Sequence, residues 1–183
     1  PDDVAEAVER APGDGTIPLS AIHPCKLNPR KTFDAGGIAA LAESIAEQGL
    51  LQGLLLRPRP GSEPGADAAF ELVDGERRWR ALQKLAEDRR IPADHPVRAE
   101  VRDLSDEEVL LLAIAANTAR EDMTPLEQAE GFLKYHEAHV ARVYGANAGP
   151  GMTLRKAQGE ATATLAKASG LDERVIQRRM KVV

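Results

Sequence analysis

Three arginines, Arg77, Arg78 and Arg80, follow Gly75 near the middle of the chain. A guanidinium group can grip a phosphate through two parallel hydrogen bonds. The free backbone N–H groups in the first turn of a helix point at one spot and also favour an anion there. The cluster therefore predicts an anion site if a helix begins close to Gly75. The alternative is a solvated basic face, which is the commoner role of such a cluster at a helix start.

The neighbouring residues predict the elements that would place this cluster. The apolar run at residues 70–73 indicates a short strand, Gly75 allows a tight turn, and residues 78–86 indicate a helix. Residues 54–57 indicate a strand that pairs with residues 70–73 as a hairpin, with a long loop between them. The alternating residues 97–101 indicate another strand.

Capping signals mark the expected helix boundaries. Asp34 is a good N-cap for a helix that Gly49 would end. Capping boxes begin at Ser105 and at Thr124, and the second has proline in its favoured first position. The helix after Thr124 is expected to bury one face, which comprises Ala129, Leu133 and either His136 or Val140.

Composition limits the class of protein. The chain has 183 residues, of which 43% are hydrophobic and 3% aromatic, so we expect one or two domains with an aliphatic core. Its one cysteine, Cys25, excludes an internal disulfide and fits a reducing compartment. No apolar run approaches the ~18 residues of a membrane span and no signal peptide opens the chain, which predicts a soluble, cytoplasmic protein. Because the chain begins at Pro1 rather than methionine, we expect it to be part of a longer protein.

Positive charge is concentrated toward the C-terminal end. Residues 153–183 hold seven lysines and arginines against three acidic residues, although the net charge of the whole chain is −5. The spacing of a helix-turn-helix is present in Leu165, Ala166, Gly170, Leu171 and Ile176. Four residues would face outward on the second helix and could reach bases or phosphates in a major groove: Arg174, Gln177, Arg178 and Lys181. An ordinary helical hairpin is the alternative.

Four sequence boxes that precede this helix-turn-helix resemble the ParB partition proteins in their order and spacing. The boxes are NPRKTF at residues 28–33, LAESI at 41–45 with Gly49 and Gln52, GERRWRA at 75–81, and Asn117 with RED at 120–122 and PLEQA at 125–129. The resemblance covers roughly residues 17–183. It implies an α+β protein, in which an N-terminal α/β domain, similar to sulfiredoxin, binds a nucleotide and a helical domain binds DNA.

The resemblance also implies how the chain is divided. Residues 1–16 are expected to form a flexible leader, residues 17–122 the ParB-like nucleotide-binding domain, and residues 123–183 the helical DNA-binding domain. The helix-turn-helix would occupy about residues 162–182. The family's separate C-terminal dimerisation domain is expected to lie beyond this chain.

In this family CTP and Mg²⁺ close a dimer into a clamp after it loads at a centromere-like DNA site. The resemblance therefore implies a CTP-binding DNA clamp that takes part in plasmid or chromosome segregation. The implied partners are double-stranded DNA with a specific, palindromic site, a partition ATPase and a second copy of the chain. The implied location is the cytoplasm, on the nucleoid or on a plasmid, with no membrane involved.

Carried over residue by residue, the resemblance assigns the triphosphate to Gly75, Glu76, Arg77 and Arg78. Gln52 corresponds to a glutamine near the nucleotide, and Arg120 would lie close by. Asn117 would lie at the Mg²⁺ side of the phosphates and is the expected metal ligand. Arg30 and Lys31 would serve DNA loading or contacts between the domains.

The chain departs from the family pattern next to Asn117. Ala116 stands where a glutamate is usual, and Mg²⁺ prefers carboxylate oxygens. Hydrolysis needs a firmly held metal, so we expect CTP to be bound but hydrolysed to CDP and phosphate only slowly. Gly53 stands where proline is usual, which indicates a divergent member of the family.

Two other functions are left open. The chain could be a sequence-specific transcriptional regulator that uses its ParB-like part only for protein interaction. It could instead be a nuclease or a sulfiredoxin-like enzyme, but sulfiredoxin chemistry needs a cysteine in the phosphate loop and Cys25 lies 50 residues before Gly75. His136 and His139 lie one helical turn apart without a convincing third metal ligand, which favours a helix-surface role.

Overall fold

The computed structural model of the chain describes residues 13–28, 30, 32–61, 70–118, 124–146 and 153–181. Its mixed sheet and helices confirm the α+β class, and the chain divides into two compact units. The first unit comprises Pro1–Lys26 and Thr32–Asp103, and the second comprises Leu27–Lys31 and Leu104–Val183. Helix α4 (Asp106–Thr118) therefore belongs to the second unit, whereas the sequence-based boundary after residue 122 assigned it to the first.

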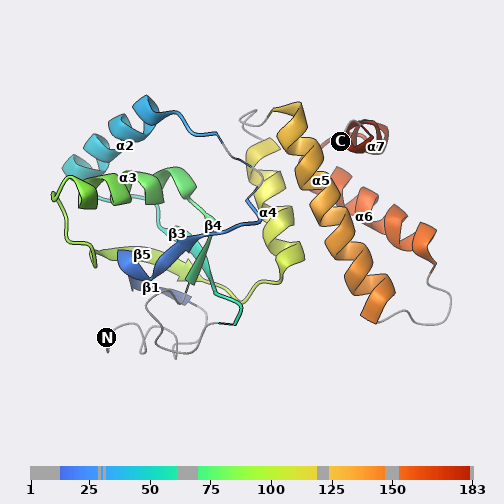
Figure 1. Ribbon diagram of the computed structural model, residues 1–183, viewed down its shortest axis with the longest axis horizontal. Helices are drawn as coiled ribbons and strands as arrows, with labels where there is room; N and C mark the ends of the chain where they lie inside the picture. Colours follow the sequence, from blue (N-terminus) through green and yellow to red (C-terminus); the bar gives the residue numbers. More distant parts are fainter. Residues whose placement is uncertain are drawn as a thin grey trace. The chain divides into compact units, whose positions relative to one another are not determined.

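A five-stranded sheet forms the centre of the first unit (Figure 1). Its strands lie in the order β1 (Gly13–Pro18), β5 (Pro96–Val101), β3 (Leu54–Pro58), β4 (Phe70–Asp74) and β2 (Ile22–Pro24). β3 and β4 pair antiparallel, which confirms the predicted hairpin. β1 is antiparallel to β5, whereas the pairs β3–β5 and β2–β4 are parallel.

The first strand overlaps the segment that was predicted to be a flexible leader. Residues 1–16 were assigned to the leader, but β1 begins at Gly13 and pairs with β5 from Gly13 opposite Val101 to Pro18 opposite Pro96. Acidic residues and glycines have low strand propensity, so the local sequence did not indicate a strand. The backbone of β5 provides the hydrogen-bond partners that make it one. Residues 1–12 lie outside the described residues.

Helices α2 (Ala35–Gln48) and α3 (Glu76–Glu87) lie together on one side of the sheet (Figure 1). Asp34 caps α2 by accepting hydrogen bonds from two backbone N–H groups of the first turn, and α2 ends at Gly49 with a φ of 75°, both as predicted. The small side chains of alanines let the two helices approach closely. Their shared buried residues are Ala42, Ala81 and Leu85.

Helices build the second unit. They are α4 (Asp106–Thr118), α5 (Pro125–Val140), the π-helical segment η2 (Ala141–Ala146), α6 (Leu154–Ser169) and α7 (Glu173–Met180). Both predicted capping boxes are present, at Ser105 with Glu108 and at Thr124 with Glu127. The buried core is formed by Leu110, Ile114, Phe132, Tyr135, Ala161, Leu165 and Ile176. Within the ranges that the structure describes, no helix combines the length and apolarity needed to cross a bilayer.

The buried face of α5 differs from the predicted one. Its buried residues include Ala129, Phe132, Tyr135 and His139. The half-buried residues include Leu133, His136 and Val140, so only Ala129 of the predicted face is fully buried. The helix is turned so that two aromatic rings enter the core, because an aromatic side chain buries more apolar area than Leu133 or Val140 would.

Candidate functional site

Gly75 makes the turn between β4 and α3. Its φ of 103° and ψ of 23° lie in the left-handed region, which residues with a side chain rarely adopt. A Cβ atom at this position would also lie only 2.6 Å from Cδ2 of Leu54. The turn lets α3 begin at Glu76, two residues earlier than predicted. Because the N-cap is glycine, no side chain of that residue covers the N–H groups of the first turn.

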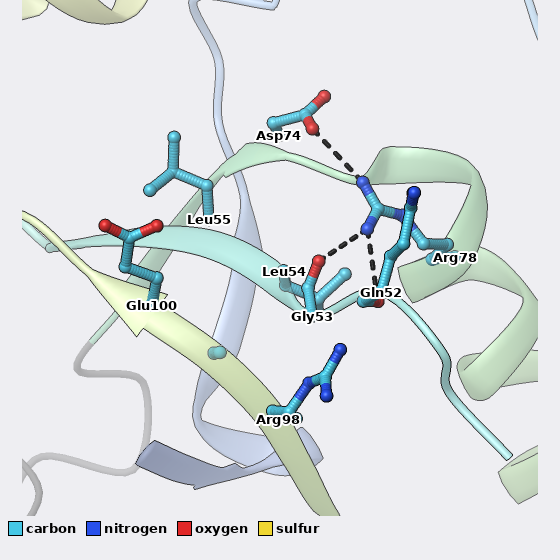
Figure 2. Close-up of a pocket in the computed structure, with 9 residues that line it drawn as sticks. Gln52, Gly53, Leu54, Leu55, Asp74, Arg78, Arg98 and Glu100 are labelled. Carbon is cyan, nitrogen blue, oxygen red and sulfur yellow. Dashed lines mark hydrogen bonds and ion pairs between the residues drawn. The ribbon is translucent and has the colours of Figure 1, made fainter. Parts of the chain in front are cut away.

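Arg78 ties the start of α3 to the loop that precedes β3. Its Nη1 donates hydrogen bonds to the carbonyl oxygens of Gln52, at 3.1 Å, and of Gly53 (Figure 2). Its Nη2 donates to Oδ2 of Asp74 at 3.1 Å and forms an ion pair with that carboxylate. Both Nη atoms therefore have protein partners, so Arg78 orders the local backbone as well as contributing charge.

A cleft of about 520 Å³ lies beside these groups and is formed by residues of β3, β4, β5, α3 and the loop before β3. It is lined by Gln52, Gly53, Leu54, Leu55, Asp74, Arg78, Arg98, Ala99 and Glu100. The fold thus brings together Gln52 and Arg78, two of the residues predicted to lie near a nucleotide. Guanidinium groups and an adjacent helix start are features that suit a phosphate-bearing ligand.

Three charged residues of this cleft were not predicted from the sequence, namely Asp74, Arg98 and Glu100. The alternating sequence of β5 indicates two of them, Arg98 and Glu100. In β5 the buried residues Val97 and Ala99 alternate with Arg98 and Glu100, and alternate residues of a strand share one face. The strand prediction for residues 97–101 therefore already placed Arg98 and Glu100 side by side on one surface.

The other charged residues at the start of α3 have different surroundings. Nε of Arg80 donates to Oε1 of Glu76 at 2.9 Å, and its guanidinium lies 4.2 Å from the centre of the Phe33 ring. Arg77 is exposed, and its Nη2 would be 3.2 Å from a Cβ atom on Gly37, so it lies next to the first turn of α2. Arg77 is therefore better placed than Arg80 to receive an anion from solvent.

The other carried-over residues are Arg30, Lys31, Asn117 and Arg120. Arg120 and Lys31 lie outside the described residues, and Asn117 lies in α4 with its side chain outside them. Arg30 belongs to the second unit, where its backbone N–H donates to Oδ1 of Asn28 at 3.0 Å. In the described part of the chain, no group of three or more His, Cys, Asp or Glu residues could hold a metal ion. The metal role of Asn117 stays a prediction.

Cys25 lies in a buried polar cluster rather than among the residues that line the cleft. Its Sγ is 3.6 Å from Oε2 of Glu71, and the same oxygen accepts a hydrogen bond from Nη2 of Arg57 at 2.7 Å. The cysteine is only 6% exposed. A thiol held in this way is not presented to a substrate, which disfavours the sulfiredoxin-like alternative.

The local geometry expected for a helix-turn-helix is present in α6 and α7. Leu165 and Ile176 are buried, Gly170 ends α6 with a φ of 69°, and Asp172 caps α7 by accepting from the backbone N–H of Arg174 at 2.8 Å. The residues predicted to face DNA are all exposed, and they are Arg174, Gln177, Arg178 and Lys181. Their contact with DNA stays a prediction.

Residues 5–118 match the ParB N-terminal domain family. The chain is 43% identical over 117 residues to the probable chromosome 1-partitioning protein ParB of Deinococcus radiodurans, covering 64% of this chain and 36% of that protein. It is 41% identical over 129 residues to the chromosome-partitioning protein Spo0J of Thermus thermophilus, covering 69% and 43%. The match thus spans less than half the length of either relative.

A solved structure has a similar fold. It is the C-terminally truncated chromosome-partitioning protein ParB from Caulobacter crescentus, complexed to the centromeric parS site. The TM-score is 0.54 with 24% sequence identity, over 92% of this chain and 71% of that one. The match over residues 5–118 comprises more than half of the chain and identifies the family. This chain belongs to the ParB N-terminal domain family.

Proposed function

We propose that this chain is the nucleotide-binding and DNA-binding part of a ParB-type partition protein. In this proposal it binds CTP in the first unit, loads onto a specific duplex through α6 and α7, and takes part in segregating a chromosome or plasmid. The proposal rests on one observation, the cleft beside the start of α3. There Arg78 donates a hydrogen bond to the backbone carbonyl of Gln52, and Gly75 is the N-cap of the helix.

The nucleotide part rests on the chemistry of that cleft. Triphosphates need hydrogen-bond donors and positive charge, which Arg77, Arg78 and the first-turn N–H groups of α3 can offer. The choice of CTP over other nucleotides follows from the family resemblance. The described residues provide no carboxylate cluster for Mg²⁺, so the ion is proposed only as a companion of the phosphates, with Asn117 as its expected ligand.

The DNA part rests on α7 and its surroundings. Arg174, Gln177 and Arg178 are exposed on a helix whose inner face is buried through Ile176, as a recognition helix requires. Their side chains are of types that bond base edges and phosphates. The remaining parts of the proposal, which follow from the family, are a palindromic site, assembly with a second copy, a partner ATPase, and a cytoplasmic location on the nucleoid or a plasmid.

Titration with labelled CTP, ATP, GTP and UTP, with and without duplex DNA that carries a candidate centromere site, tests the proposal. Of the four nucleotides, only CTP should bind well. The chain should also bind that DNA more tightly than a scrambled duplex of equal length. DNA binding without any nucleotide binding would favour the transcriptional-regulator alternative. Binding of all four nucleotides with equal affinity would contradict the proposed specificity.

A further inference from the structure

Two arginines from different elements hold the same three-residue loop, Leu51 to Gly53. Arg78 of α3 donates to the carbonyl oxygens of Gln52 and Gly53, and Nη2 of Arg98 in β5 donates to the carbonyl oxygen of Leu51. In Figure 2 the two guanidinium groups lie on opposite sides of Gly53. The backbone that carries Gln52 is thus fixed from both sides, at the edge of the cleft.

Gly53 makes the approach of Arg98 to this loop possible. A Cβ atom at Gly53 would lie 3.0 Å from the carbonyl oxygen of Arg98 and 3.5 Å from its Nε. The first distance is closer than ordinary van der Waals contact, so the loop and β5 would have to shift by a few tenths of an ångström to accept a side chain at Gly53. With glycine there, the Arg98 side chain passes close to the loop backbone and into the lining of the cleft.

Arg98 differs from the other charged residues of the cleft in its ion pairing. Asp74 is paired with Arg78 at 3.1 Å, and Glu100 is paired with Arg102 at 2.6 Å. Among the residues that the structure describes, no carboxylate pairs with Arg98, and no acceptor is bonded to its Nε or Nη1. The cleft therefore contains an exposed guanidinium that forms no ion pair with a described residue and retains donors for a ligand.

We propose that Arg98 is a further anion-binding residue of this cleft. Its Nη2 keeps the Gln52 loop in place, and its remaining donors bind a phosphate of the nucleotide opposite Arg78. The ligand class is a nucleoside triphosphate, so this inference rests on the proposed function of the cleft. A planar guanidinium can hold the loop carbonyl and a phosphate oxygen at the same time, whereas a lysine ammonium is a point charge without this fork.

The test is calorimetric titration of the wild type, Arg98→Ala and Arg98→Lys with CTP, CDP and CMP. Arg98→Ala should weaken CTP binding roughly 10- to 100-fold, the range expected for a charged hydrogen bond. The loss should be smaller for CMP, which has fewer phosphates to reach Arg98. Arg98→Lys should retain part of the affinity. Arg59→Ala is the matched control, since Arg59 is exposed and is not among the lining residues.

Unchanged CTP affinity in Arg98→Ala would overturn the proposal. An equal loss for CTP, CDP and CMP would also overturn it, because it would mean that Arg98 only positions the Gln52 loop. If the wild type binds no nucleotide, the proposed function fails, and inorganic tripolyphosphate then decides the role of Arg98. Weaker tripolyphosphate binding in Arg98→Ala than in Arg59→Ala would support an anion site, and equal binding would overturn it.

Discussion

Arg179 in α7 donates a hydrogen bond from Nη1 to the side-chain oxygen of Gln128 in α5. Gln128 is 9% exposed, so its amide oxygen has little access to water. Arg179 follows directly after Arg178, which is exposed on the same helix. Two adjacent arginines of α7 therefore have different roles, because one side chain is available to a ligand and the other holds the helix against α5.

The two arginines should respond differently to replacement by alanine. Arg178→Ala should weaken binding to the specific duplex by about 1–3 kcal/mol if Arg178 contacts a base. Arg179→Ala should instead lower the stability of the folded chain by about 1–3 kcal/mol, because it leaves the buried Gln128 oxygen without its partner. Thermal unfolding and binding to specific and scrambled duplexes separate the two effects. Loss of stability in Arg178→Ala, with none in Arg179→Ala, would contradict the assignment.

Arg77 should be needed for CTP binding but not for folding, because its side chain is exposed at the start of α3. We expect Arg77→Ala to lower CTP affinity at least 10-fold, as loss of a charged hydrogen bond would. Arg80→Ala is the control, since Arg80 is paired with Glu76. Calorimetry gives the affinities, and a thermal scan checks the fold. A stability loss in Arg77→Ala would mean that Arg77 is structural.

Gly75 and Gly159 offer a pair of glycine substitutions with opposite expected signs. Gly75→Ala should destabilise the chain by more than about 1 kcal/mol, because its φ of 103° strains any side chain and its Cβ would meet Leu54. Gly159 lies within α6 with open space around it, so Gly159→Ala should stabilise by about 0.5–1 kcal/mol. Chemical denaturation measures both changes. A neutral Gly75→Ala would show that the turn relaxes at no cost.

The stability of the folded chain should fall at acid pH because the carboxylate of Glu107 becomes protonated. Burial alone would raise the pKa of this carboxyl, but hydrogen bonds from Arg142 and His139 outweigh burial and hold the pKa below its ordinary value of 4.5. Tyr135 also donates to Oε1 of Glu107, at 3.3 Å. A lowered folded-state pKa means that the contribution is complete above the unfolded pKa, near 4.5, and is lost as the pH falls through the folded value.

Glu107→Gln should therefore destabilise the chain at pH 7 by about 1–3 kcal/mol and flatten the loss of stability below pH 4.5. Glu137→Gln, at an exposed position of α5, should leave both features unchanged. Thermal unfolding from pH 3 to 7 compares the three proteins. Identical pH profiles for the wild type and Glu107→Gln would exclude Glu107 as the group responsible.

Features that depend on residues a few positions apart could be predicted from the local sequence. The turn at Gly75, the cap at Asp34, the helix end at Gly49 and the capping boxes at Ser105 and Thr124 were all predicted. Each involves backbone conformation or a hydrogen bond over one to four residues, so local residue types are sufficient to indicate it. The exposed face of α7 was predicted for the same reason.

Features that depend on distant partners follow from the packing of the folded chain. The bonds from Arg78 to Gln52 and from Arg98 to Leu51 span 26 and 47 residues, and no local pattern encodes such pairings. The strand at Gly13–Pro18 exists because β5 pairs with it, and α4 joins the second unit because its buried Leu110 and Ile114 pack in the helical core. Apolar periodicity indicates that a surface is buried, but packing selects the surface that covers it.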